Sequence, residues 1–266
     1  MKSNLCALTI AGSDSGGGAG IQADLKTFAA HGVHGLSAIA ALTAQNTRKV
    51  LAIEVPSIKF LHAQIDACFS DFKIASVKIG MLANTRVIKA VAEALLQHKA
   101  KNIVLDPVMV ASSGASLLEP SALKAMRELL LPMAAIITPN IPEAELLLGH
   151  AIKNADAADA ATVELLAMGA KAVLLKGGHL PGSTMTDRYD DGELFAEFIH
   201  KKLKLEGHGT GCTLASAIAA NLCLGKNLPQ SCSAATDYVH GALIHAYKPG
   251  KGKVAVLDHF WQSGTD

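Results

Sequence analysis

Residues 76–105, SVKIGMLANTRVIKAVAEALLQHKAKNIVL, contain the unit on which the whole chain is built. Ser76–Ile79 and Ile103–Leu105 are short apolar runs, and between them apolar residues recur at helical spacing in Val87–His98. A strand, a helix and a second strand in this order are typical of two parallel strands joined by a crossover helix. The stretch therefore predicts an α/β fold with a parallel sheet.

The same alternation of strand and helix continues on both sides of this unit. Asp191-Gly192 interrupts it with a tight-turn signal, which predicts a late antiparallel hairpin. The other expected strands are Leu5–Ala11, Ser37–Leu42, Ala135–Thr138 and Ala172–Leu175. The other expected helices are Phe60–Asp71, Pro120–Leu130, Asp159–Met168, Thr213–Leu224 and Gln230–His245. Composition does not change along the chain, so we expect one domain over residues 1–266, a three-layer α/β/α sandwich with a mostly parallel central sheet.

The composition excludes several classes of function. The 24 basic residues nearly balance 23 acidic ones, so a nucleic-acid partner is not expected. Hydrophobic residues make up 50% of the chain, but no uninterrupted apolar run is long enough to cross a bilayer, so no membrane is expected either. The start of the chain lacks the pattern of a secretory signal, which favours a cytoplasmic location. Five scattered cysteines without a CxxC pair argue against a zinc site and a disulfide framework.

Polar residues follow the predicted strands, at the edge where ligands of open parallel sheets bind. The turn Gly207–Cys212 opens a helix, and its free backbone N–H groups could hold a phosphate, although a glycine turn can also serve backbone geometry alone. Asp106 and Glu143 could bind Mg²⁺ or cap helices, and Lys176 could reach a phosphate oxygen or lie in solvent. Together these groups suffice for phosphoryl transfer. His208 borders the turn and is expected to hydrogen-bond to loop backbone.

Two familiar nucleotide-binding motifs are missing from the sequence. No G-x-x-x-x-G-K-[ST] occurs, and residues 16–20, GGGAG, do not fit G-x-G-x-x-G. These early glycines therefore favour a backbone that closes over a small substrate.

Eight segments, in order, resemble the hydroxymethylpyrimidine and phosphomethylpyrimidine kinases of thiamine biosynthesis, in the ribokinase-like superfamily. They are TIAGSD (9–14), AGIQAD (19–24), AQNT (44–47), KIGML (78–82), LDPVM (105–109), TPNIPE (138–143), KGGH (176–179) and HGTGCTL (208–214). The resemblance implies two successive ATP-dependent phosphorylations of a small pyrimidine, with Mg²⁺, in a cytoplasmic homodimer.

The resemblance also implies roles for individual residues. The pyrimidine would be bound by Gln45, Asp24, Gly12, Ala19, Met81 and Val108. Catalysis would involve Cys212, Gly209, Thr210, Gly211 and Lys176, with Cys212 as the base for the attacking hydroxyl. The nucleotide would meet Lys176, Asn140, Thr210 and Gly211, and the metal Asp106 and Glu143. A thiol beside a helix N-terminus is expected to have a lowered pKa, which suits a base.

Two other functions are compatible with parts of this pattern. Some similar kinases accept pyridoxal, and a nearby cysteine can add to its aldehyde. A non-catalytic binding protein could keep the fold, but the full set of Asp106, Glu143, Lys176 and Gly209–Cys212 argues against it. Gly16 and Glu206-Gly207 depart from the family pattern, which puts rates and specificity in question more than the reaction class.

Overall fold

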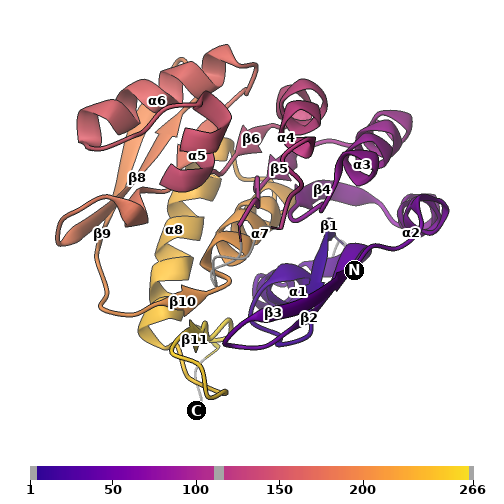
Figure 1. Cartoon of the computed structure of the whole chain (residues 1–266), viewed down its shortest axis with the longest axis horizontal. Helices are drawn as coiled ribbons and strands as arrows, with labels where there is room; N and C mark the ends of the chain where they lie inside the picture. Colours follow the sequence, from indigo (N-terminus) through magenta and orange to yellow (C-terminus); the bar gives the residue numbers. More distant parts are fainter. Residues whose placement is uncertain (1–4, 111–116, 264–266) are drawn as a thin grey trace.

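A mixed nine-stranded sheet runs through the computed structural model, which describes residues 5–110 and 117–263 (Figure 1). Its strands are β1 Cys6–Asp14, β2 His34–Gln45, β3 Val50–Glu54, β4 Ile74–Ile79, β5 Ile103–Leu105, β6 Ile136–Ile137, β7 Val173–Leu175, β8 Thr184–Asp190 and β9 Phe195–Lys201. They lie in the order β3-β2-β1-β4-β5-β6-β7-β8-β9. Neighbours from β2 to β7 are parallel, whereas the pairs β3–β2, β8–β7 and β9–β8 are antiparallel.

Helices cover both faces of this sheet. They are α1 Gly20–Ala30, α2 Ile58–Asp71, α3 Thr85–Gln97, α4 Ala122–Ala125, α5 Ile141–Leu148, α6 Ala155–Ala167, α7 Thr210–Cys223 and α8 Leu228–Ile244. Short helical turns complete the set: a π-helical turn η1 Met126–Leu130 and the 3-10 turns η2 Leu131–Met133 and η3 Gly177–His179. Helices α2 to α6 pack on one face, and α1, α7 and α8 pack on the other. The predicted α/β/α sandwich is therefore confirmed.

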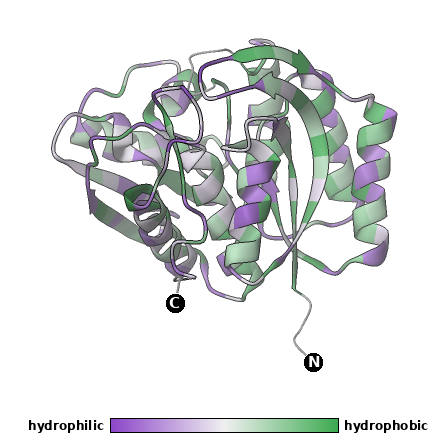
Figure 2. Cartoon of the chain, turned by 90° about the horizontal axis from the view of Figure 1, so that it is seen from below, coloured by the Kyte–Doolittle hydropathy of each residue, from purple (hydrophilic) through white to green (hydrophobic). Residues whose placement is uncertain are grey.

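The strands show how the sequence supplies both cores. In β7, Val173 and Leu175 pack with the α2–α6 layer, while Leu174, between them, packs with the α7–α8 layer. Successive side chains of a strand point to opposite faces, so a strand covered on both sides must be apolar throughout. In the hydropathy view, green hydrophobic strands lie between helices that carry purple segments (Figure 2).

Helix α3 of the opening unit illustrates why these segments are helical. Asn84 caps its first turn by accepting a hydrogen bond from the Val87 amide. Val87, Val91 and Leu95 are buried at helical spacing, whereas Glu93 is exposed. Burying such a face supplies most of the stability of a helix of this length.

The structure differs from the expected element pattern at a few places. The segment expected as one helix over Pro120–Leu130 begins as α4 and widens into the π-helical turn η1. Helices α1 and α5 and strand β3 were not predicted. A second, two-stranded parallel sheet joins β10 Gly207–His208 to β11 Ala255–Val256, near the C-terminal end of the described chain. None of the helices within the described residues is long and apolar enough to cross a bilayer.

Candidate active site

The turn Gly207–Cys212, here called the phosphate turn, leads into α7 at the carboxyl edge of the parallel strands. Gly209 is the N-cap of α7 and has a left-handed φ of 84°. A Cβ at Gly209 would lie 1.9 Å from the Gly18 carbonyl oxygen, so only glycine fits. Because glycine has no side chain, it cannot cap the first amides of α7, and these amides stay available to an anion.

Lys176, Asp106 and Glu143 meet in front of this turn. Lys176 Nζ lies 3.0 Å from Asp106 Oδ1 and 3.6 Å from Glu143 Oε2. A Cβ at Gly211 would lie 3.0 Å from Lys176 Nζ and 3.5 Å from Asp106 Oδ2, which shows that the cluster contacts the turn itself. Three of the residues predicted from separate strand ends are therefore brought together beside the predicted anion site.

The charges of Lys176, Asp106 and Glu143 act on one another, and a bound phosphate or metal would change this balance. Burial raises the pKa of the Glu143 carboxyl to about 7, against the opposing effect of Lys176. Burial alone would lower the pKa of Lys176, but Asp106 and Glu143 outweigh it and raise that pKa above its ordinary value. The cation is thus held between two carboxylates in the free protein.

Glu143 has a second task in the local structure. Its carboxylate accepts a hydrogen bond from the Asn140 amide at 2.8 Å, and the Asn140 side chain accepts one from the Glu143 amide at 2.8 Å. This capping box starts α5 and fixes where the carboxylate lies. The capping alternative is therefore confirmed for Glu143, and its role as a metal ligand stays a prediction.

The carboxylates of Asp106 and Glu143 suit Mg²⁺, which prefers hard oxygen ligands. Within residues 5–110 and 117–263, no group of three or more His, Cys, Asp or Glu side chains could hold a metal ion. A Mg²⁺ ion bound here would therefore take most of its ligands from water and from phosphate oxygens, as this ion commonly does.

Cys212 is half-buried in the first turn of α7. Burial raises the pKa of its thiol to about 11; Lys78 opposes that effect, while Asp24 and Asp106 add to it. The expected lowering is therefore wrong for the free protein, because lost hydration and nearby negative charge outweigh the effects of Lys78 and the Gly20 backbone. The five cysteines are all free thiols, as expected from their spacing.

Three of the predicted pyrimidine-binding residues form a small apolar wall. A Cβ at Gly12 would lie 3.0 Å from Met81 Sδ, so the glycine allows the thioether to approach the β1 backbone. Met81 is buried, and the half-buried Val108 packs against the same cluster. Ala19 is the N-cap residue of α1, and its amide donates a hydrogen bond to Asp14. Flat apolar contact of this kind suits one face of an aromatic ring.

Asp24 occupies a different environment from the one expected. It is fully buried, and Lys78 Nζ lies 2.9 Å from Oδ1 and 3.0 Å from Oδ2. Thr9 and Ser216 donate hydroxyl hydrogen bonds to it at 2.6 and 2.7 Å. Both carboxylate oxygens are thus engaged by the protein, and a substrate would have to displace these donors to reach them.

Asp14, which carried no assigned role in the sequence, and His208, which was expected to hydrogen-bond to loop backbone, connect the two halves of the site. Asp14 accepts hydrogen bonds from the amides of Gly16, Gly18 and Ala19 at 2.7 to 3.0 Å. His208 Nε2 lies 3.0 Å from Asp14 Oδ2, so His208 reaches side chains as well as the loop. Both residues stand in the segments TIAGSD and HGTGCTL, but 194 positions separate them, and no local pattern predicts the contact.

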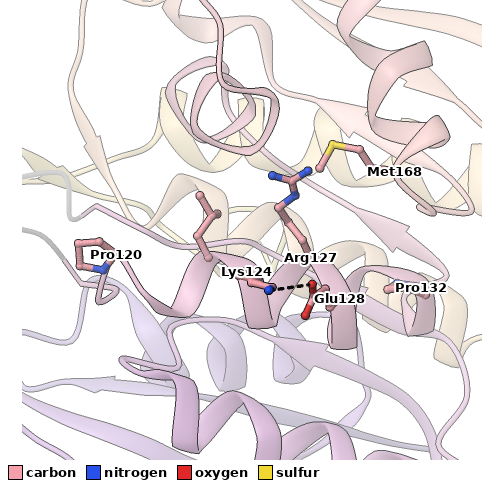
Figure 3. A pocket seen from close by; sticks show the side chains of 7 residues that line it. Pro120, Lys124, Arg127, Glu128, Pro132 and Met168 are labelled. Carbon is pink, nitrogen blue, oxygen red and sulfur yellow. Dashed lines mark ion pairs between the residues drawn. The ribbon is translucent and has the colours of Figure 1, made fainter.

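Two cavities of the described chain lie away from the Lys176 cluster. One of about 690 Å³ lies between the α4–η1 segment and the end of α6, and it contains none of the candidate residues (Figure 3). Its lining residues are Pro120, Leu123, Lys124, Arg127, Glu128, Pro132 and Met168. A second, of about 410 Å³, touches the substrate side at Gly16 and is otherwise lined by Asn46, Thr47, Arg48, Pro249, Gly250 and Lys251.

Comparison with known proteins connects this geometry to a reaction. The family model described as phosphomethylpyrimidine kinase matches residues 14–257. A hydroxymethylpyrimidine/phosphomethylpyrimidine kinase of Rhizobium meliloti is 48% identical over 262 residues, covering 96% of this chain and 98% of the relative.

Solved structures show the same similarity. The phosphomethylpyrimidine kinase of Clostridium difficile is 44% identical with a TM-score of 0.80, covering 89% of this chain and 98% of that one. An ADP complex of Bacillus subtilis pyridoxal kinase is 32% identical with a TM-score of 0.91, covering 98% and 99%. The fold is thus shared with pyridoxal kinases and with phosphomethylpyrimidine kinases, and the sequence identity is higher to the phosphomethylpyrimidine kinases.

Proposed function

Because this chain belongs to the phosphomethylpyrimidine kinase family, we propose that it phosphorylates 4-amino-5-hydroxymethyl-2-methylpyrimidine with ATP, and then its monophosphate, in thiamine diphosphate biosynthesis. One observation of the structure carries most weight. The uncapped phosphate turn lies beside Lys176, Asp106 and Glu143. The turn offers the anion site, Lys176 the cation and the two carboxylates the oxygen ligands that phosphoryl transfer needs. The product of the second step is the pyrimidine diphosphate.

The chain's own residues have distinct tasks in this reaction. Gly12, Met81 and Val108 supply apolar contact to the pyrimidine ring, and the Gln45 amide offers both a donor and an acceptor to its polar edge. The amides of Thr210 and Gly211 would hold the migrating phosphoryl group, and Asn140, the N-cap of α5, would contact the nucleotide.

The base proposed for the attacking hydroxyl is Cys212. Its Sγ would take the proton of the attacking hydroxyl while the hydroxyl oxygen forms its bond to the terminal phosphorus of ATP and the bond to the ADP oxygen breaks. A thiol with a pKa of about 11 is mostly protonated at neutral pH. The proton transfer must therefore depend on extra positive charge at the site.

Mg²⁺ would be held by Asp106 and Glu143, directly or through water, and when bound it supplies positive charge to the phosphate oxygens. Lys176 adds a second positive charge from its position between these carboxylates. The Lys176 side chain is 14% exposed, so its ammonium would be able to reach a phosphate oxygen if the carboxylates held Mg²⁺.

The same proposal covers assembly and location. We expect a homodimer in the cytoplasm, as the resemblance to the kinase family implies. Size-exclusion chromatography with light scattering tests the first expectation, because a monomer and a dimer of a 27.6 kDa chain are readily separated.

A second substrate, pyridoxal, is favoured by one observation, the TM-scores of 0.89 to 0.91 with pyridoxal kinases. Their identity of 31 to 32% is lower than the 42 to 48% found with the named pyrimidine kinases and bifunctional thiamine enzymes. The pyrimidine is therefore the preferred substrate.

The deciding experiment follows ADP release from Mg-ATP with three acceptors: the hydroxymethylpyrimidine, its monophosphate and pyridoxal. We expect turnover with both pyrimidines and a higher kcat/KM for the alcohol than for pyridoxal. A preference for pyridoxal of more than about tenfold, equal to 1.4 kcal/mol in transition-state binding, would overturn the substrate assignment. No ADP with any acceptor would overturn the kinase assignment.

A further inference from the structure

Three side chains from distant parts of the sequence meet beside the predicted pyrimidine site. Asp14 ends β1, Gln45 ends β2, and His208 lies in the phosphate turn. His208 Nε2 lies 3.0 Å from Asp14 Oδ2 and 3.1 Å from Gln45 Nε2. Asp14 and His208 are buried and Gln45 is half-buried, so these contacts are sheltered from bulk water.

Hydrogen-bond chemistry permits only one consistent arrangement of these groups. Burial works against an ionised Asp14, but hydrogen bonds from His208, Gly16 and Ala19 outweigh it and lower the pKa of the carboxyl. An ionised carboxylate only accepts, so His208 Nε2 must carry a hydrogen. A nitrogen that carries a hydrogen cannot accept from the Gln45 amide nitrogen.

A half-turn of the Gln45 amide removes this conflict. Its oxygen then accepts from His208 Nε2, and its nitrogen donates to Thr43 Oγ1, which is 3.2 Å from the other end of the amide. The Thr43 hydroxyl donates to the Ser13 carbonyl at 3.0 Å, which leaves its oxygen free to accept. One imidazole hydrogen is therefore shared between Asp14 and Gln45.

The pair also holds two backbone segments against each other. Asp14 gathers the amides of the loop at residues 16–19, and His208 is adjacent to Gly209, whose backbone packs against Gly18. A Cβ at Gly18 would lie 2.4 Å from the His208 ring, so the imidazole lies directly on the loop. Movement of the loop is therefore transmitted to the phosphate turn.

We propose that Asp14 and His208 are positioning residues that couple the two ligand sites. When a pyrimidine engages Gln45, the hydrogen on His208 Nε2 is no longer shared with Gln45 and is donated to Asp14, and the phosphate turn is held in its anion-binding form. This inference rests on the proposed function. It assigns a role to residues that need not touch the reacting atoms. By linkage, the nucleotide must favour pyrimidine binding by the same factor.

Calorimetry with a non-transferable ATP analogue, AMP-PCP, measures this coupling. Its Kd is determined with Mg²⁺, with and without saturating hydroxymethylpyrimidine. In the unaltered protein we expect the pyrimidine to tighten AMP-PCP by about fivefold or more, within the usual range of coupling between sites. In His208→Phe, which removes the donor but keeps a ring, we expect a ratio near one.

Two further variants separate positioning from bulk structure. His208→Gln can place an amide donor near the position of Nε2, and we expect it to keep most of the coupling. His34→Phe replaces an exposed histidine at the start of β2 and should leave the ratio unchanged. A purely structural role for His208 would instead weaken both ligands in both His208 variants and leave their ratio intact.

The outcomes are distinct for the two levels of inference. Full coupling in His208→Phe overturns the positioning role. Failure of the unaltered protein to bind the pyrimidine overturns the proposed function instead.

If His208→Phe does not fold, the ¹⁵N spectrum of the unaltered protein decides. A hydrogen on His208 Nε2, and a shift of that nitrogen when the pyrimidine alone is added, are expected. A bare Nε2, or no shift, would overturn the positioning role.

Discussion

The buried ion pair between Lys78 and Asp24 allows a quantitative test of what holds the centre of the molecule together. Both side chains are fully buried, and the ammonium lies 2.9 Å from Asp24 Oδ1. Two unit charges about 3 Å apart attract by about 5 kcal/mol at an effective dielectric constant near 20, and desolvation of both groups offsets much of this. The pair itself is therefore worth little, but its disruption leaves an unpaired buried charge.

Lys78→Met should accordingly lower the free energy of unfolding by about 3–5 kcal/mol, because the Asp24 carboxyl loses its cation and must stay as an unpaired buried charge or take up a proton. Asp24→Asn combined with Lys78→Met removes both charges, and the Asn can still bond to Thr9 and Ser216. We expect the double variant to recover at least half of the loss. Urea unfolding followed by far-UV circular dichroism, with the fluorescence of the single Trp261 as a second probe, measures both values.

Two results would refute this reasoning. One is a loss below about 1 kcal/mol in Lys78→Met, which is the range of an exposed ion pair. The other is a double variant no more stable than the single one, which would mean that shape, and not charge, limits the site. Lys124→Met is a matched control, because Lys124 is 81% exposed and its ion pair with Glu128 spans 3.8 Å.

Three further predictions concern catalysis, backbone and pH. Cys212→Ala should lower kcat by about 10²-fold or more, while the affinity for AMP-PCP stays within about threefold. Steady-state kinetics and calorimetry measure the two quantities, and near-normal turnover would remove Cys212 as the base. Gly209→Ala should abolish turnover and destabilise the fold, because its Cβ would lie 1.9 Å from the Gly18 carbonyl oxygen. Gly225 has a similar φ of 89° but open space around it, so Gly225→Ala should lower the free energy of unfolding in urea by only about 1–2 kcal/mol. Equal losses in the two variants would contradict the steric argument. Burial lowers the pKa of His259 from 6.5 to about 4, so on acidification the unfolded chain takes up this proton before the folded one does. The stability present above pH 6.5 should therefore fall by roughly 2–3 kcal/mol at most as the pH drops to 4, and this fall should be largely absent in His259→Gln. An unchanged dependence on pH in that variant would point to other groups.

Much of the fold followed from the sequence because apolar periodicity is a local signal. Strands β4 and β5 and helix α3 lie where their runs predicted them, and the Asp191-Gly192 turn joins β8 to β9 as expected. Strand β3 was missed because Val50–Glu54 is largely exposed and lacks a buried alternating face. Helix α1 was missed because it begins at Gly20, without a side-chain cap.

Some features of the candidate site could likewise be predicted from local sequence, and others could not. Asp106, Glu143 and Lys176 could be grouped in advance because each follows a strand, and parallel strands bring their ends to one edge. The buried position of Asp24 could not be predicted, since it depends on Lys78 in the middle of the apolar strand β4. The raised pKa of Cys212 likewise depends on packing from several elements.

The small sheet β10–β11 has a consequence for how the entrance to α7 is anchored. Ala255 and Val256 are far along the chain from Gly207 and His208, yet they pair with them directly before the α7 helix start. This pairing lies outside the nine-stranded sheet. Proteolytic cleavage between α8 and β11 should therefore weaken nucleotide retention before it disturbs the main sheet.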